Sequence, residues 1–444
     1  MLLLLIVKSK CQQITAFIMK LEIPRGMRDI ESEELHNINY IKEKFVETTC
    51  LFNFKVMEPS PLEMLTTLEA KAGESISNEI YSFTDKGHRN IALRFDLTIG
   101  LTRFVATRRD LKMPVKLASF SDVWRYDEPQ AGRYRYFHQW DIEIYGPFSK
   151  ESDAEVIEFV SVFLKKLGLN VMVEVNDRQL IEEYIKQKLG VSEEQIIPDI
   201  LRAVDKVTKK SLSELYEEYK DKINLFTLQH LVDLSSIKGS VNEVYSKADL
   251  KGLENWSKVA ALMDSLKSRR VDNVRVNLGI VRGLDYYSGV VFEAFDPFIE
   301  LGALVGGGRY DRLTHAFGRE DIGAIGAAGG VERIVMALKK NGILKYVPKQ
   351  MVYVAYTSSI IKTSALGIVS MLRSSGISTD YNLNNGRSLR KQLDDAASKG
   401  AVLTVIVGPE EIEKGEVTVR SMDNGTESKQ KVNELAKILD RMFH

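Results

Sequence analysis

The sequence predicts an α+β protein: an antiparallel sheet flanked by helices, a helical insertion, and a separate C-terminal α/β domain. Strand-like segments follow one another between residues 91 and 145 without regular intervening helices, which favours antiparallel pairing. The stretch from 171 to about 268 is patterned in Leu and Ile, rich in Lys and Glu, and almost without strand signal. Strands and helices alternate beyond residue 350. A chain of 444 residues also exceeds one ordinary core, so more than one domain is expected.

The first half of the chain contains a helix and then mainly strands. Residues 31–49 predict an amphipathic helix, because apolar side chains are spaced for one buried face. The residues of this face are Leu35, Ile38, Ile41, Phe45 and Val46. Strands are expected at 54–57, 91–95, 117–120, 140–145 and 171–175, with a helix at 150–166.

After the helical stretch, strands resume at 274–278 and 290–295. The glycine-rich runs 306–311 and 326–333 are interpreted as strand-to-helix turns, and the second opens a helix to about residue 338. In the C-terminal part we expect strands at 351–356, 377–381 and 401–407, and helices at about 360–375, 388–399 and 431–443.

These elements predict five parts of the chain. Residues 1–18 form an extension upstream of Met19, and 19–170 form the first part of a core. Residues 171–270 are a mostly helical insertion, 271–345 complete the core, and 346–444 are the C-terminal α/β domain. The apolar start from Met1 to Val7 is far shorter than the roughly 20 residues of a membrane span, and it lacks the features of a secretory signal.

The composition limits the classes of function. The chain has 61 Lys and Arg residues and 61 Asp and Glu residues, so its net charge is zero. This balance argues against nonspecific binding of polyanions, although local basic patches can still hold a large RNA. Two cysteines, Cys11 and Cys50, form no disulfide framework and favour a reducing, cytoplasmic compartment. The six histidines are scattered, which argues against a structural zinc site.

Cations and aromatic residues gather in the segment 124–145. Arg125 follows an apolar strand, and its planar guanidinium suits a two-pronged contact with phosphate. Arg133, Arg135 and Phe137 alternate along the next strand, so they share one face, and Gln139, Asp141 and Glu143 continue it. Such a face suits a nucleotide, with phosphates on the arginines and a base on the ring. It is also compatible with the polar side of a half-exposed strand.

Two further segments carry candidate site residues. Arg282 precedes the adjacent pair Tyr286 and Tyr287 in a turn bracketed by glycines, a combination suited to an anion and a small polar ligand. Asp96 lies at a strand end, where it serves equally well as a ligand contact or as a helix N-cap. Together these segments predict a site for an anionic nucleotide and a small polar substrate.

The order of these segments resembles the histidyl-tRNA synthetases, which are class II aminoacyl-tRNA synthetases, over about residues 22–440. Residues 24–29 resemble the family's opening, and the helix and strand ending at Pro59 resemble the dimer-forming motif 1. Residues 124–145 resemble motif 2, and 326–333 resemble motif 3. The segments 282–287 and 307–311 resemble the two histidine-specific signatures, and 405–417 is similar to part of the anticodon-binding domain. The run 94–98 resembles the archaeal and eukaryotic form.

The resemblance implies a histidine–tRNA ligase that uses ATP with Mg²⁺, acts on L-histidine and tRNA(His), and forms a cytoplasmic homodimer. Arg125 would hold the α-phosphate of ATP and Arg333 the γ-phosphate, with Phe137 stacked on adenine and Arg133 also on the nucleotide. Arg282 and Arg125 would be catalytic, with Arg282 between the histidine carboxylate and the α-phosphate. Histidine itself would be bound by Asp96, Leu97, Thr98, Gln139, Glu143, Tyr286 and Tyr287, where Glu143 accepts a hydrogen bond from the imidazole.

Three alternatives share parts of this pattern. The histidine-sensing regulatory subunit of ATP phosphoribosyltransferase uses the same core, but it typically lacks the C-terminal domain and loses catalytic positions. A non-catalytic RNA-binding relative predicts damage at Arg282 or in motif 2, and none is present. A class II synthetase for another amino acid is disfavoured by the segment around Tyr286 and Tyr287.

Overall fold

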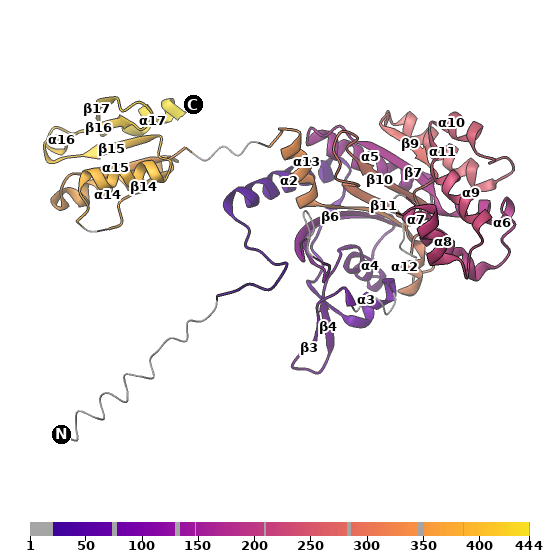
Figure 1. The fold of residues 1–444 in the computed structure, drawn as a ribbon. Coiled ribbons are helices and arrows are strands. Elements are labelled where there is room, and N and C mark those ends of the chain that lie inside the picture. The colour runs from indigo at the N-terminus through magenta and orange to yellow at the C-terminus, as the bar shows by residue number, and fades with distance from the viewer. Residues whose placement is uncertain are drawn as a thin grey trace, which may run out of the picture. The chain divides into compact units, whose positions relative to one another are not determined.

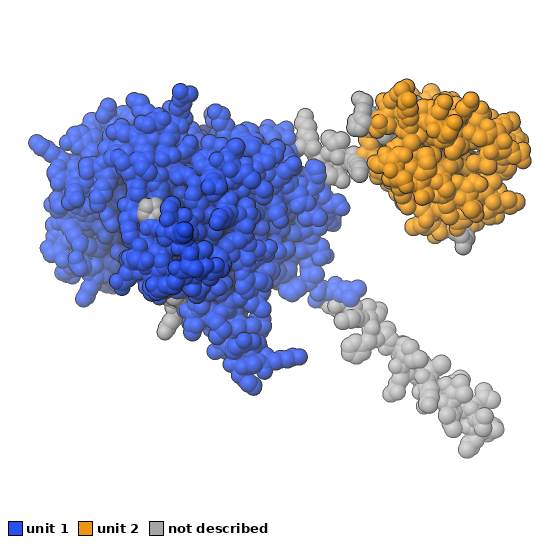
Figure 2. Space-filling view, turned by 180° about the vertical axis from the view of Figure 1, so that it is seen from behind, with its two compact units in different colours: residues 1–345 blue, residues 346–444 orange. Residues whose placement is uncertain are grey.

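The computed structural model describes residues 21–72, 78–128, 134–146, 148–207, 210–281, 286–344, 350–384 and 386–443. The chain divides into two compact units, residues 1–345 and 346–444 (Figure 2), and each is considered by itself. The predicted extension 1–18 lies outside the described residues. Within the described ranges, no helix has the length and apolar character needed to cross a membrane.

Unit 1 is built on a sheet of nine strands in the order β1-β5-β6-β12-β11-β10-β7-β9-β8. Neighbouring strands run antiparallel except at the β1–β5 and β7–β9 pairs, so the predicted antiparallel sheet is confirmed. The strands are β1 (Lys55–Val56), β5 (Val115–Trp124), β6 (Tyr136–Gly146), β7 (Met172–Asp177), β8 (Lys238–Gly239), β9 (Val274–Asn277), β10 (Val290–Phe295), β11 (Val305–Arg309) and β12 (Gly323–Gly330).

Three helices cover one face of this sheet (Figure 1): α2 (Ser32–Leu51), α5 (Lys150–Lys166) and α13 (Val331–Lys340). Phe45 of α2 meets Trp140, Phe159 and Phe163 at ring-centroid distances of 5.6–6.0 Å, which forms the aromatic centre of the core. The predicted buried face of α2 is correct for Ile38, Ile41 and Phe45. It is wrong for its two outer members, because Leu35 is 46% exposed and Val46 is 37% exposed.

The other face carries a small three-stranded sheet and three helices (Figure 1). The small sheet has the strand order β2-β4-β3. Helix α4 packs against β6 of the large sheet, and α12 packs against β12. These elements are β2 (Leu62–Met64), α3 (Leu65–Ala72), β3 (Ser82–Thr84), β4 (Asn90–Leu93), α4 (Thr98–Thr107) and α12 (Asp311–Ala316).

Between β7 and β9 the chain forms a mainly helical region with its own core, which includes Leu180, Leu201, Leu228 and Trp256. The short strand β8 pairs with β9 and joins this region to the edge of the large sheet. The helices are α6 (Arg178–Gln187), η2 (Glu194–Ile196), α7 (Ile197–Lys206), α8 (Leu212–Tyr219), α9 (Leu225–Ser235), α10 (Val241–Lys247) and α11 (Glu254–Ser268).

Both glycine-rich runs pass from a strand to a helix as predicted, β11 to α12 and β12 to α13, but the interpretation of their glycines as turn residues is wrong, because all of them lie inside the strands. Neighbouring side chains occupy the space that a Cβ would need. A Cβ on Gly307 would lie 2.3 Å from the ring of Phe292, and one on Gly329 would lie 2.6 Å from the indole nitrogen of Trp140. Glycine here permits close packing over the strands rather than a sharp turn.

Unit 2 is a five-stranded mixed sheet in the order β14-β13-β15-β16-β17, with β13 parallel to both β14 and β15. The predicted alternation of strands and helices is present up to β15, whereas the antiparallel β16 and β17 were not predicted as strands. The elements are β13 (Val352–Tyr356), η3 (Ser359–Ile361), α14 (Lys362–Ser374), β14 (Thr379–Tyr381), α15 (Leu389–Ser398), β15 (Leu403–Val407), α16 (Pro409–Glu413), β16 (Glu416–Ser421), β17 (Glu427–Lys431) and α17 (Leu435–Phe443).

Candidate active site

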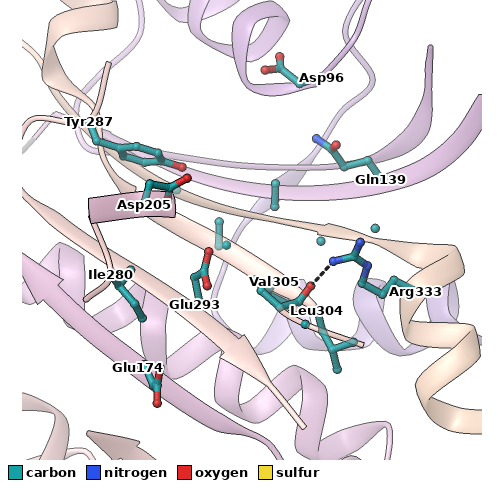
Figure 3. A pocket seen from close by; sticks show the side chains of 18 of the residues that line it. Asp96, Gln139, Glu174, Asp205, Ile280, Tyr287, Glu293, Leu304, Val305 and Arg333 are labelled. Atoms are coloured by element: carbon teal, nitrogen blue, oxygen red, sulfur yellow. Dashed lines mark hydrogen bonds between the residues drawn. The ribbon is translucent and has the colours of Figure 1, made fainter. Parts of the chain in front are cut away.

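A cavity of about 1140 Å³ lies on the face of the large sheet opposite α2, α5 and α13, because Gln139 and Glu143 line it, whereas the alternate residues Trp140 and Ile142 lie in the core with these helices. Its floor is formed by strands β6, β10, β11 and β12, and Arg333 enters from the first turn of α13 (Figure 3). A second part of the cavity extends toward the helical region, where Asp205 and Ile280 line it. The volume exceeds that of a typical small-ligand pocket and suits more than one substrate.

Glu143 marks the most enclosed part of the floor, where it is 1% exposed. The hydroxyl of Tyr310 donates a hydrogen bond to Glu143 Oε2. Gly326 lies beside Glu143 in the register of β6 and β12, and a Cβ there would be 1.6 Å from the same oxygen. The glycine therefore makes room for the carboxylate, and the tyrosine fixes its orientation.

The hydroxyl of Tyr310 remains a donor at physiological pH. Burial and the nearby charge of Glu143 raise the pKa of Tyr310 well above its usual value. The same two causes raise the pKa of the neighbouring Tyr145. A buried carboxylate oriented by a neutral phenol can accept a hydrogen bond from an N–H donor of a small substrate.

Asp141 joins several predicted site residues below the cavity. Its Oδ2 accepts from the hydroxyl of Thr98 at 3.0 Å, and its Oδ1 accepts from the amide of Gln139 at 2.8 Å. Gln139 Oε1 in turn accepts from Arg125 Nη2 at 3.1 Å. This chain fixes the rotamers of Thr98, Gln139 and Arg125, so their positions do not depend on a bound ligand.

Arg125, which follows β5, and Phe137, which lies on β6, are brought together in the structure. The guanidinium lies 5.1 Å from the centroid of the Phe137 ring, and its Nε donates to the carbonyl of Phe95 at 2.9 Å. Both side chains line the cavity. A flat ring beside a guanidinium provides a stacking surface for a base next to a cation for its phosphate.

Arg333 lies on a different element from Arg125 but borders the same cavity (Figure 3). Its Nη1 donates to the carbonyl of Ala303 at 2.8 Å, which ties the arginine to the loop before β11. Two guanidinium groups from separate elements thus border one space, which suits a ligand with several negative charges.

Tyr286 and Tyr287 also line the cavity, with ring centroids 4.4 Å apart. Tyr286 packs edge-on against Tyr310 at 6.2 Å, and Tyr287 is buried against the strand at Gly308. Three tyrosines and Glu143 therefore gather at one end of the cavity. This end is aromatic and carries a carboxylate, whereas the guanidinium groups of Arg125 and Arg333 border the other end.

The remaining predicted residues differ in their positions. Asp96 lines the cavity, and its Oδ1 accepts from the backbone N–H of Ile99 at 3.1 Å in the first turn of α4, while its role as a ligand contact stays a prediction. Leu97 is fully buried and is not among the residues that line the cavity. Arg282 and Arg133 lie outside the described residues.

Arg309, in the second glycine-rich run, holds the scaffold. Its guanidinium pairs with Asp153 at 2.6 Å and with Asp311 at 3.2 Å, which attaches β11 to the start of α5. Burial raises the pKa of Asp153 to about 6, although Arg309 opposes this shift. The pair is therefore structural and does not line the cavity.

Sequence reasoning assigned no role to Tyr310 or Glu293, which both line the cavity. Tyr310 stands within the segment 307–311, which resembles a histidine-specific signature, but the sequence gives no contact for its side chain. Glu293 interrupts the apolar strand β10, and a charge within such a strand was the available signal.

Comparisons with known proteins cover nearly the whole chain. The family model described as histidyl-tRNA synthetase matches residues 26–334, and the one described as anticodon binding domain matches 351–442. A histidine–tRNA ligase of Thermoplasma volcanium is 32% identical, over 95% of this chain and 99% of that protein. One from Pyrococcus furiosus is 34% identical, over 94% and 98%.

Solved structures agree with the fold. The histidyl-tRNA synthetase of Nostoc superposes with a TM-score of 0.76 at 24% identity, covering 96% of this chain and all of that chain. A Bacillus halodurans protein described as an ATP phosphoribosyltransferase regulatory subunit/histidyl-tRNA synthetase gives a TM-score of 0.71 at 22% identity, covering 88% and 98%.

Proposed function

Because this chain belongs to the histidyl-tRNA synthetase family, we propose that it is a histidine–tRNA ligase: it activates L-histidine with ATP and transfers the histidyl group to the 3′ end of tRNA(His). The observation that carries the proposal is the pairing of Glu143 with Tyr310 at one end of a cavity whose other end holds Arg125 and Arg333. The first end suits an imidazole, and the second suits a triphosphate.

Recognition of histidine follows from buried polar partners. Glu143 accepts a hydrogen bond from the imidazole N–H, and an apolar side chain placed there would leave this carboxylate desolvated and unpaired. Asp96, Thr98 and Gln139 bind the ammonium and carboxylate groups, and Tyr286 and Tyr287 close the pocket. Leu97 contributes through its backbone, since its side chain lies in the core.

The nucleotide occupies the cationic end. Adenine stacks on Phe137, Arg125 binds the α-phosphate, and Arg333 binds the γ-phosphate, with Arg133 also on the nucleotide. The histidine carboxylate attacks the α-phosphorus, the bond to the bridging oxygen breaks, and pyrophosphate leaves. This step brings two anions together, so the guanidinium group of Arg125, which Phe95 and Gln139 already hold, lowers its barrier, and we assign the same role to Arg282.

The cavity also suits a metal ion that is bound together with the nucleotide. Glu293 lines it, and Mg²⁺ is commonly held by one or two carboxylates together with substrate phosphates. When bound to Glu293 and the phosphate oxygens, Mg²⁺ would neutralise charge on the leaving pyrophosphate.

Two further features concern the tRNA partner and the cellular compartment. Residues 346–444 form a separate unit, and we assign tRNA anticodon binding to it on the strength of the matching family model. The two cysteines favour the cytoplasm.

Exposed apolar side chains support a homodimer. Met64, Ile91 and Phe83 lie opposite one another across the small sheet, and Met64 and Phe83 are 43% and 50% exposed. Leu35 and Val46 of α2 are also exposed. Exposed apolar side chains grouped on one element are typical of a protein interface. Sedimentation equilibrium of the purified protein should give the mass of two chains, and the mass of one chain would refute this assignment.

Charging of tRNA tests the whole proposal. Purified protein, ATP and radiolabelled histidine should transfer label to acid-precipitable tRNA from an archaeal or eukaryotic source. Pretreating the tRNA with periodate destroys its terminal diol and should abolish transfer. Absence of charging with intact tRNA, while ATP and histidine still bind, would favour the regulatory or non-catalytic alternatives.

A further inference from the structure

The nucleotide end of the cavity is bordered by a buried polar network that no step above uses, and Glu332 of this network lines the cavity. The network is centred on Glu332, which precedes Arg333 in the first turn of α13 and has a side chain only 6% exposed. Its partners come from three other segments: His138 in β6, Asp122 in β5 through His138, and Arg28 before α2.

The contacts converge on one carboxylate. Glu332 Oε1 and Oε2 accept from the backbone N–H of His138 at 3.0 and 3.1 Å, and Nδ1 of the same histidine lies 3.0 Å from Oε1. The other ring nitrogen, Nε2, lies 3.0 Å from Asp122 Oδ1. Arg28 Nη2 donates to Glu332 Oε1 at 3.2 Å. Glu332 thus holds the start of α13 against β6 through both backbone and side chain.

Arg28 extends the network to the wall of the cavity. Its guanidinium lies 3.7 Å from the centroid of the Tyr134 ring, and its Nη1 donates to the carbonyl of Tyr136 at 2.8 Å. Tyr134 lines the cavity. Residue 26 adds a backbone bond, since the carbonyl of Gly26 accepts from the N–H of Arg135 at 3.0 Å. The segment around Arg28 therefore restrains the beginning of β6.

The sequence neighbours of these anchors are proposed nucleotide contacts. His138 directly follows Phe137, and Glu332 directly precedes Arg333. Gly330, just before α13, is in register with Gln139. A guanidinium reaches a phosphate productively only when its helix and the base-stacking strand keep a fixed spacing.

We infer that Glu332, held by His138 and Arg28, is a positioning residue that sets where Arg333 meets the triphosphate. This inference rests on the proposed function for the identity of the nucleotide. It concerns geometry rather than chemistry, because both carboxylate oxygens of Glu332 already accept hydrogen bonds from His138 or Arg28. Its loss should therefore weaken ATP binding selectively, whereas a general loss of stability would affect both substrates alike.

The test is a double-mutant cycle read by equilibrium binding of ATP in calorimetric titrations. Replacing Glu332 by Gln keeps the shape of the side chain and removes its charge, so Kd for ATP should rise about tenfold, the equivalent of weakening one charge-assisted hydrogen bond. The KM for histidine in ATP–pyrophosphate exchange should change by less than about twofold. In an Arg333→Ala background, Glu332→Gln should add nothing further to Kd, because the positioned group is gone.

Glu183→Gln is the matched control. Glu183 also accepts two backbone N–H groups, from Glu254 at 2.8 Å and Asn255 at 2.9 Å, but it lies in the helical region. This variant should leave Kd for ATP unchanged. If Glu332→Gln does not fold, Arg28→Lys disturbs the same contact and should give the same selective rise.

Three results would overturn the inference: an unchanged Kd for ATP, equal losses for ATP and histidine, or an additive effect in the Arg333→Ala background. Failure of the proposed function would look different. The wild-type protein would then show no histidine-dependent exchange, while the ATP cycle would still decide the positioning role.

Discussion

Replacing Tyr310 by Phe isolates the contact on which histidine recognition depends. The substitution removes one hydroxyl from a residue that is 2% exposed and keeps the ring that packs against Tyr286. The lost interaction is a hydrogen bond to the buried carboxylate of Glu143, a type that contributes about 1.5–3 kcal/mol. We expect the KM for histidine to rise roughly 10- to 150-fold, since every 1.4 kcal/mol is a factor of ten.

The assay is ATP–pyrophosphate exchange with histidine varied at saturating ATP, and then with ATP varied at saturating histidine. The KM for ATP should stay within about twofold of the wild-type value, because Tyr310 lies at the opposite end of the cavity from Arg333. Tyr353→Phe is a matched control. The hydroxyl of Tyr353 also donates to a carboxylate, Asp395 at 2.9 Å, but in unit 2. This control should leave both KM values unchanged.

Two results would refute the reasoning. An unchanged KM for histidine in the Tyr310→Phe variant would mean that Glu143 is oriented adequately without the phenol, or that it does not bind the substrate. An equal rise in KM for ATP would mean that the substitution deforms the sheet rather than the histidine pocket.

Other substitutions test the remaining assignments. Arg282→His should cost about 3–4 kcal/mol in the activation step, with histidine binding reduced less, and unchanged exchange would end the assignment of Arg282. Gly326→Ala puts a methyl group 1.6 Å from Glu143 Oε2; it should destabilise the fold by about 1–3 kcal/mol in thermal denaturation and raise the KM for histidine. Arg125→Lys should raise the KM for ATP about tenfold through loss of the two-pronged phosphate contact, and a change in the KM for histidine alone would contradict this role. Deleting residues 350–444 should abolish tRNA charging while leaving adenylate formation measurable, and equal loss of both would contradict a separable anticodon-binding unit.

Much of the fold could be predicted from the periodicity of apolar residues in the sequence. The buried face of α2, the antiparallel order of β5 and β6, and the alternation in unit 2 follow from side-chain spacing, which is local information. The glycine-rich runs were misinterpreted because the reason for their glycines is not local. A Cβ on Gly326 would clash with Glu143 of the neighbouring strand β6, and a Cβ on Gly307 would clash with Phe292 of the neighbouring strand β10. Such pairings appear only when the strands are assembled.

The same difference between local spacing and contacts distant in sequence applies to the candidate site. Alternation along β6 placed Phe137, Gln139 and Glu143 on one face, and the structure lines one cavity with them. The bond from Tyr310 to Glu143 spans 167 sequence positions, so no spacing rule could predict it. The exposed apolar residues on α2 were likewise assigned to the core, because a sequence pattern does not distinguish an apolar helix position that meets the sheet from one that stays exposed.

The most direct test of the account is ATP–pyrophosphate exchange by the purified protein with each of the twenty standard amino acids in turn. The buried pair of Glu143 and Tyr310, facing the arginines across one cavity, predicts exchange with histidine and only background rates with the others. No exchange with histidine, or faster exchange with any other amino acid, would contradict it.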